Sequence, residues 1–256
     1  MLLQCGMDGD ADEGARRAAA WLGAATLESL AELNEAGLSL LAEQAAVPAE
    51  PRAPLREVGA LWRALDASAR RRAAGAPYLL LDGGFGDRER WRHTAGSQVA
   101  DPGRAAAAFF TVPATVEVAR LHFTFAWHLA RAQSAAARLL LGMPAGCAAL
   151  IAGCTLRRMH TLAERRPDWL RPRWPSHPEL YRELLRAAGA GEGRALERAR
   201  LHGLTLLAAE ARAAEAGARA DVAPGTAAGS AANTARLTLP AGTTSTAPSP
   251  RSPARP

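Results

Sequence analysis

The sequence predicts a mainly α-helical fold: a helical bundle with a helix-turn-helix-like unit, at most one short strand and a disordered C-terminal tail. Apolar residues recur every three or four positions through most of the 256-residue chain, as expected for helices that bury one face. Pro and Gly clusters divide these stretches into separate helices. Beyond Ala218 the residues are mainly Ala, Gly, Thr, Ser and Pro, which bury too little surface to offset the entropy of ordering.

The patterns divide the chain into three predicted regions. Residues 15–110 form an N-terminal helical region of unknown role, residues 111–216 form a helical dimer module, and residues 217–256 form the tail. The first region opens with an apolar stripe made of Trp21, Leu27, Leu30 and Leu33. "NEAG" at 34–37 should break or kink this helix, and a loop should come next at 47–54, because its prolines cannot lie inside a helix.

The next helix turns its apolar residues inward, namely Leu55, Val58, Leu61, Trp62 and Leu65. Asp66 or Ser68 can cap a further short helix. "APYLLLDGGFGDRERW", residues 76–91, is the single strand-like segment, in which an apolar run meets a Gly-rich turn and Asp87 can cap the segment after it. Its glycines fit neither GxGxxG nor the P-loop pattern, so a tight turn is favoured over a phosphate-binding loop.

The longest predicted helix covers residues 115–141 and is apolar on more than one side. Such a helix usually faces both its own core and a partner chain, so we expect a homodimer. The predicted dimer interface consists of Leu121, Phe123, Phe125, Trp127 and Leu129. His122 and His128 on the same helix are expected to be packing or rim residues rather than ligands.

Two short helices come after it, at 145–152 and from Thr155 to about Arg166. Gly153 between them permits a left-handed bend, and Thr155 can cap the second helix. One face of that helix is apolar and is expected to comprise Leu156, Met159, Leu162 and Ala163. A basic face opposite it, joined to a first helix by a three-residue turn, is typical of helix-turn-helix DNA readers.

Spacing and charge support this interpretation. Ala149, Gly153, Cys154, Met159 and Leu162 occupy the small, glycine and apolar positions of the helix-turn-helix pattern. The net charge is +6, and all 31 basic residues are Arg; residues 154–174 alone hold six arginines against two carboxylates. The predicted DNA-binding residues are Arg157, Arg158, His160 and Thr161 at the groove, with Arg165 and Arg173 on phosphates. The alternative is a packing corner within a bundle, with a solvated arginine face.

The stretch "LLLGMPAGCAALIAGCTLRRMHTLAERRPDWLRPRW" also resembles a known family, the D subunit of the bacterial flagellar master transcriptional regulator (FlhD). The likeness covers about residues 115–190, and residues 15–110 have no counterpart in it. It implies an all-helical dimer that acts as a co-regulator, activating transcription from promoter DNA with a zinc-bearing C-type partner subunit. The connection "RRPDWLRPRWPSHPE" is richer in Pro and Trp than the family's equivalent.

This connection is interpreted as a rigid extended segment at 171–175 whose Trp169 and Trp174 anchor in the core, rather than as a nucleic-acid clamp. After it, Ser176 with Glu179 should form a capping box. A last helix is expected at about 192–216, with its inward residues Leu196, Leu204 and Leu207. A faint echo between the segments that begin at Thr26 and Thr155 suggests a duplication, although helical periodicity alone could produce it.

Other chemistry finds little support. Cys147, Cys154 and His160 lack zinc-site spacing, no GxSxG or HExxH motif occurs, and no nucleophile–base pair is evident, so we expect no metal, no cofactor, no small-molecule substrate and no enzyme. Three cysteines without CxxC fit a reducing compartment. The acidic turn soon after the first residues makes a poor secretory signal, and no apolar run could span a membrane, so a cytoplasmic protein is expected.

Two functional hypotheses remain open. The first is a DNA-associated transcriptional co-regulator of the FlhD type, acting as a helical dimer with a partner subunit. The second is a helical protein–protein interaction scaffold or adaptor without nucleic-acid binding. They differ in whether duplex DNA binds with steep salt dependence through Arg157 and Arg158.

Overall fold

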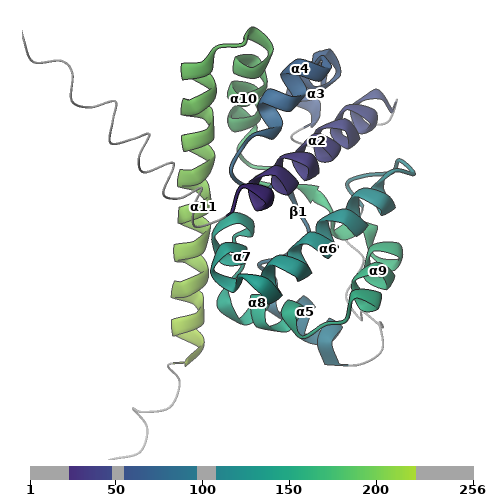
Figure 1. Cartoon of the computed structure of the whole chain (residues 1–256), viewed down its shortest axis with the longest axis vertical. Coiled ribbons are helices and arrows are strands. Elements are labelled where there is room, and N and C mark those ends of the chain that lie inside the picture. Colours follow the sequence, from purple (N-terminus) through teal and green to yellow (C-terminus); the bar gives the residue numbers. More distant parts are fainter. Residues whose placement is uncertain (1–22, 48–54, 97–107, 223–256) are drawn as a thin grey trace, which may run out of the picture. The chain divides into compact units, whose positions relative to one another are not determined.

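The computed structural model describes residues 23–47, 55–96 and 108–222, which are mainly helical, as predicted. The helices are α2 (Ala24–Ala46), α3 (Leu55–Ala64), α4 (Ala67–Ala74), α5 (Arg88–Gly96), α6 (Thr115–Ala132), α7 (Ser134–Leu141), α8 (Ala145–Ala152), α9 (Leu156–Arg165), α10 (Pro178–Ala190) and α11 (Gly193–Val222), with a 3-10 turn η1 (Pro167–Trp169) (Figure 1). Helix α11 extends beyond the predicted start of the tail, and the rest of that tail, like Trp21 and residues 48–54, lies outside the described residues.

The strand-like segment at residue 76 onward contains β1 (Leu81–Asp82), as expected, and β1 pairs with a second short strand, β2 (Arg171–Pro172). The pairing is antiparallel, with Leu81 opposite Pro172. The second strand lies in the segment that was predicted to be an extended connection, and both tryptophans beside it are buried, as predicted: Trp169 is 3% and Trp174 6% exposed. A connection that is already extended supplies the backbone geometry that a strand needs.

Helix α2 runs without a break through "NEAG", so the break that the sequence suggested there is absent. The Asn34 side chain is buried, and its Nδ2 donates to the carbonyl oxygens of Ala74, Ala76 and Tyr78 at 2.9–3.3 Å. Its Oδ1 accepts from the Leu80 N–H at 2.9 Å. A residue that looks like a helix breaker in sequence therefore serves as a tertiary clamp, which binds the segment leading into β1.

The predicted long helix at 115–141 is two helices, α6 and α7, because Gln133 leaves the helical region with φ −148° and ψ 73°. Gly142 then ends α7 in the left-handed conformation, with φ 66°. Asp66 caps α4 as predicted, accepting from the Ala69 N–H at 2.7 Å. Ser176 forms no capping box: α10 begins at Pro178 after His177, whose Nδ1 lies 3.0 Å from a Glu179 carboxylate oxygen.

The sequence predicted separate regions at residues 15–110 and 111–216. In the structure the described residues of these two regions pack together. The described residues up to Ala218 belong to one compact unit. Helix α2 packs on α6, α10 packs on α3 and α4, and α5 packs on α8, so the two predicted regions cover each other's apolar faces. Sequence periodicity indicates that a helix has an apolar face but says nothing about which segment covers it.

An aromatic cluster marks the centre of this shared core. Trp91 from α5 meets Phe123 from α6 and Trp169 from η1 edge-on, with ring centroids 6.3 and 5.6 Å apart. Phe85 stacks against Trp91, and the Trp91 Nε1 donates to the Gly84 carbonyl at 2.9 Å. Residues on both sides of the predicted boundary therefore share one buried cluster.

Replacing Asn34 with Ala should lower the free energy of unfolding by about 3 kcal/mol or more, because the Leu80 N–H and three carbonyls lose a buried partner. Urea unfolding followed by circular dichroism measures this loss. Glu32→Ala, at an exposed position of the same helix, should change stability by no more than about 0.5 kcal/mol. Equal stability of the two variants would contradict the clamp.

Candidate nucleic-acid interface

The helix-turn-helix-like unit consists of α8, a short turn and α9. Thr155 caps α9 as predicted, since its hydroxyl accepts from the Arg158 N–H at 3.2 Å. The predicted left-handed bend at Gly153 is wrong: its φ is −74° and its ψ −14°, and its N–H still bonds to the Ala149 carbonyl at 3.1 Å. The turn is made after Gly153, where Thr155 adopts an extended backbone.

Helix α9 attaches to α6 through its buried residues Met159, Leu162 and Ala163, as the apolar spacing predicted. Leu156 was expected on this face, but it is 40% exposed. Its position in the first turn of the helix places it at the edge of the contact with α6. The unit therefore packs on α6, and the first turn of α9 is exposed to solvent.

The predicted DNA-binding residues on α9 fall into two groups. Arg157 and Arg165 are exposed, and neither pairs with a carboxylate in the described ranges. Arg158, His160 and Thr161 are half-buried. The Nε and Nη2 atoms of Arg158 are buried with no hydrogen-bond partner among the residues that the structure describes. Buried guanidinium nitrogens without an acceptor are unfavourable, so a phosphate oxygen would satisfy them only after the side chain turns outward.

Arg173 does not belong to this surface, so its predicted contact with phosphate is corrected. It is only 5% exposed, its Nη2 donates to a Glu210 carboxylate oxygen at 2.8 Å, and the same atom donates to the Leu141 carbonyl at 3.1 Å. A Cβ at Gly142 would collide with its guanidinium group. Arg173 therefore joins α7 to α11 within the fold.

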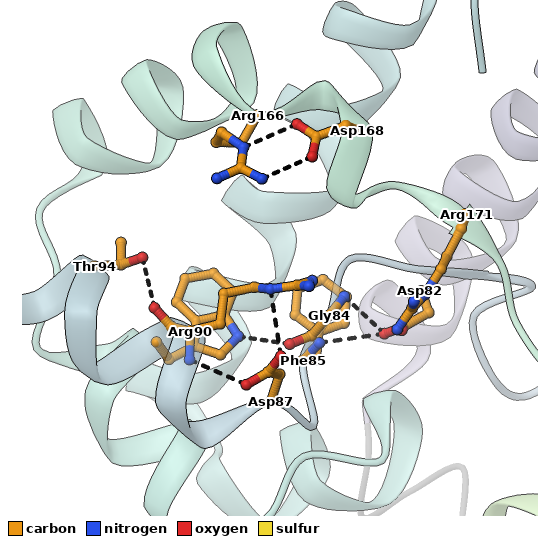
Figure 2. A network of polar contacts seen from close by, with 10 residues as sticks. Asp82, Gly84, Phe85, Asp87, Arg90, Thr94, Arg166, Asp168 and Arg171 are labelled. Carbon is orange, nitrogen blue, oxygen red and sulfur yellow. Dashed lines mark hydrogen bonds and ion pairs between the residues drawn. The ribbon is translucent and has the colours of Figure 1, made fainter. Parts of the chain in front are cut away.

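Two other arginines of the basic stretch are also paired within the molecule. Figure 2 shows Arg166 in a bidentate pair with Asp168, with distances of 2.9 and 2.8 Å, and Arg171 reaching Asp82 at 3.4 Å. The charge of residues 154–174 is thus partly neutralised, and its free portion is concentrated on α9. Only the tertiary structure decides this division, because Asp82 and the carboxylate that binds Arg173 lie far away in sequence.

One neighbour of the turn was not predicted from the sequence. The Trp127 indole Nε1 donates to the Cys154 carbonyl at 2.7 Å, which ties α6 to the turn. Exposed Arg131 lies over the Trp127 ring, 5.0 Å from its centroid, and donates to the Ala152 carbonyl at 3.3 Å. The spacing of Trp127 and Arg131, one helical turn apart, is the signal that could have revealed it.

Most residues of the predicted dimer interface on α6 pack within the chain itself. Phe123 is fully buried and Leu129 is 3% exposed, so neither can contact a second chain. Phe125 and Trp127 are half-buried and pack on the core. Leu121, at 44% exposure, is the member that remains open. The sequence predicted a second chain as the partner of this helix. In the structure α6 packs instead on the N-terminal part of its own chain, because α2 and Phe85 lie against it.

The Gly-rich turn after β1 is closed to phosphate. One Asp82 carboxylate oxygen accepts from the Gly84 and Phe85 N–H groups at 3.0 and 3.2 Å, so the amides that a phosphate would use are occupied (Figure 2). Asp87 caps α5, as predicted, by accepting from the Arg90 N–H at 3.0 Å. The segment is a tight turn between packed elements.

Two titratable groups near the unit have pKa values that burial shifts. Burial raises the pKa of the Cys147 thiol to about 11, which keeps it protonated at neutral pH. Burial lowers the pKa of His122 to about 4, and its Nδ1 bonds to the Val118 carbonyl at 2.9 Å. Throughout the described residues, no group of three His, Cys, Asp or Glu side chains could hold a metal ion, and none of the helices there is long and apolar enough to cross a bilayer.

Comparisons of this chain with protein-family models, with curated proteins and with solved structures find no match. The resemblance to the FlhD family therefore stays a prediction.

Arg173→Met should lower the free energy of unfolding by about 2 kcal/mol, because the Leu141 carbonyl loses a buried donor and Glu210 loses its partner. Arg171→Met is the matched control. Its ion pair with Asp82 is half-exposed and should contribute less than about 1 kcal/mol. If both variants unfold at the same denaturant concentration, the contacts of Arg173 with Leu141 and Glu210 do not stabilise the fold.

Acid should destabilise the protein through His122. Its pKa in the fold, about 4, lies below the ordinary value of 6.5, so between these pH values the unfolded chain takes up a proton that the folded chain refuses. Its contribution is complete above pH 6.5 and declines by up to about 3 kcal/mol as the pH falls to 4. His122→Gln should flatten the pH dependence of urea unfolding, whereas exposed His128→Gln should leave it unchanged.

Proposed function

We propose that this protein is a DNA-associated transcriptional co-regulator whose α8–α9 unit contacts the duplex. The proposal rests on which arginines of residues 154–174 have a carboxylate partner within the fold. Arg157, Arg158 and Arg165 on α9 have no carboxylate partner in the described part of the chain, whereas the arginines after them are paired. An unneutralised basic face on the second helix of such a unit is the charge distribution that duplex phosphates require.

The contacts can be assigned to separate roles. Arg157 lies in the first turn of α9, the part of a recognition helix that reaches base edges, with His160 and Thr161 beyond it. Arg158 and Arg165 are suited to phosphate oxygens. Arg131 extends the same basic surface from α6, because it lies beside the end of α8. We propose a cytoplasmic location for this role, which three cysteines without a CxxC motif also favour.

The resemblance to the FlhD family bears on the partner. It implies that the regulator works with a zinc-bearing C-type subunit, to which this chain would add a helical surface. Large apolar side chains that stay exposed offer such a surface, namely Leu121, Leu139, Leu156 and Leu201. The same residues are what a helical interaction scaffold would display, so the scaffold is the second candidate.

Arg157→Ala with Arg158→Ala should weaken binding to a fluorescent duplex of about 40 base pairs and mixed sequence. The slope of log affinity against log salt should become shallower by about 0.9, since Arg158 is the phosphate contact of this pair and about 0.9 is lost for each such contact. Fluorescence anisotropy at several salt concentrations measures both effects.

The control is the double variant Arg194→Ala with Arg198→Ala, which removes the same charge from exposed positions of α11. It should keep the wild-type slope. If the wild-type chain shows no salt-dependent binding, or if both double variants behave alike, the co-regulator proposal fails and the scaffold is favoured.

A further inference from the structure

The described residues contain the same order of elements twice. A long helix, two short helices, a two-residue strand and a further helix occur as α2, α3, α4, β1 and α5, and again as α6, α8, α9, β2 and α10. Only α7 and η1 interrupt the second series, and α11 comes after it. Arg88 follows Asp82 at the same spacing as Pro178 follows Pro172, so the strand-to-helix connections are equally long.

Local details repeat with the elements. The side chain of Asp66 accepts from the N–H three residues on, and Thr155 does the same in the second series. The buried positions also agree. Ala73 and Ala74 are buried seven and eight residues after Asp66, and Leu162 and Ala163 are buried seven and eight residues after Thr155. An aromatic residue three positions into the last helix is fully buried in both series, and the pair is Trp91 and Tyr181.

The register differs from the faint echo in the sequence. That echo aligned the segment at Thr26 with the segment at Thr155, but Thr26 lies in α2, whose counterpart is α6. The counterpart of α9 is α4. The repeat is carried by the order, capping and burial of the elements, which residue identity in this Ala-rich chain hides.

The two series exchange contacts as two subunits related by a two-fold axis would. Helix α2 packs on α3 and α4 as α6 packs on α8 and α9, and α2 and α6 meet each other (Figure 1). The last helix of each series crosses over: α10 packs on α3 and α4, and α5 packs on α8. The strands also pair between the series and run antiparallel, which a two-fold axis through the ladder requires.

We infer that α3–α4 is a second DNA-contacting unit, equivalent to α8–α9, so that one chain presents both half-site contacts that helix-turn-helix proteins otherwise obtain by dimerisation. This inference rests on the proposed function of α8–α9. The chain then needs no second copy, which agrees with the burial of Phe123 against Phe85 and Trp91 of its own N-terminal part. The ligand is duplex DNA with two contact positions along one face.

Charge supports this occupant. Arg63 and Arg71 are exposed on α3 and α4. Arg63 has no carboxylate partner within the described residues. The Arg71 side chain is 74% exposed, and its Nε lies 3.9 Å from a Glu35 carboxylate oxygen, at the long end of the range for an ion pair. Ala67 and Ser68 are open in the first turn of α4, as Leu156 and Arg157 are on α9. Arg72 is excluded from the surface, because its Nε donates to the Ala188 carbonyl at 2.7 Å.

The specificity of the site is set by the differences between the units. The first turn of α4 offers Ala67 and Ser68 where α9 offers Leu156 and Arg157, so the two helices contact base edges with different groups. A symmetric homodimer reads a palindrome, because its two recognition helices are identical. This chain should therefore favour a site whose two halves differ.

The test uses the full-length chain, sedimentation and anisotropy with the same duplex of about 40 base pairs. Three double variants are compared: Arg63→Ala with Arg71→Ala, Arg157→Ala with Arg158→Ala, and the α11 control Arg194→Ala with Arg198→Ala. We expect a monomer that binds one chain per two contact positions. The first two variants should each weaken binding about tenfold relative to the control and make the salt slope shallower, by about 0.9 for each phosphate contact removed. Circular dichroism confirms that each variant is folded.

The outcomes separate this inference from the function on which it rests. If the α9 variant weakens binding and the Arg63/Arg71 variant matches the α11 control, α3–α4 contacts no DNA, so the inference is overturned while the proposed function stands. A chain that sediments as a dimer and binds as two chains per duplex also overturns it. If neither unit's variant differs from the control, the proposed function fails, and the inference fails with it.

Discussion

The peptide groups of Leu80 hold together parts of the chain that lie far apart in sequence. Its N–H donates to the Asn34 carboxamide in α2 at 2.9 Å, and its carbonyl accepts from the Arg173 N–H and the Tyr181 hydroxyl at 2.9 and 2.8 Å. These bonds are buried, so each has no water to replace it when broken. The position of β1, and with it the pairing to β2, depends on this junction.

The junction explains why the described residues up to Ala218 form one compact unit. An antiparallel ladder between β1 and β2 brings the helix after each strand onto the other series, where α10 covers α3 and α4 and α5 covers α8. Neither series could bury its own apolar surface alone, because the covering helix comes from the other. Trp91 packs against Phe123 and Trp169, and Tyr181 packs against Trp62; both Trp91 and Tyr181 are fully buried.

The same packing determines which arginines remain available. Arg173 is drawn inward by a carbonyl of α7 and a carboxylate of α11, and Arg166 and Arg171 are paired. Basic charge without a carboxylate partner in the described residues is then left on α9 and at exposed Arg63 of α3, while exposed Arg71 of α4 has only a 3.9 Å pair with Glu35. A chain with a net charge of +6 thus acquires localised basic faces through the choice of internal partners rather than through composition.

Much of the local structure could be predicted from the sequence because it depends on near neighbours. Helical periodicity, the Asp66, Asp87 and Thr155 caps, the two short helices and the anchored Trp169 and Trp174 were all correct. Sequence alone could not show that Asn34 clamps a distant segment, that Arg173 is internal, or that Phe123 faces the chain's own first half. Those outcomes depend on which apolar faces and polar groups meet from segments 32 to 46 residues apart, and only the tertiary structure decides that.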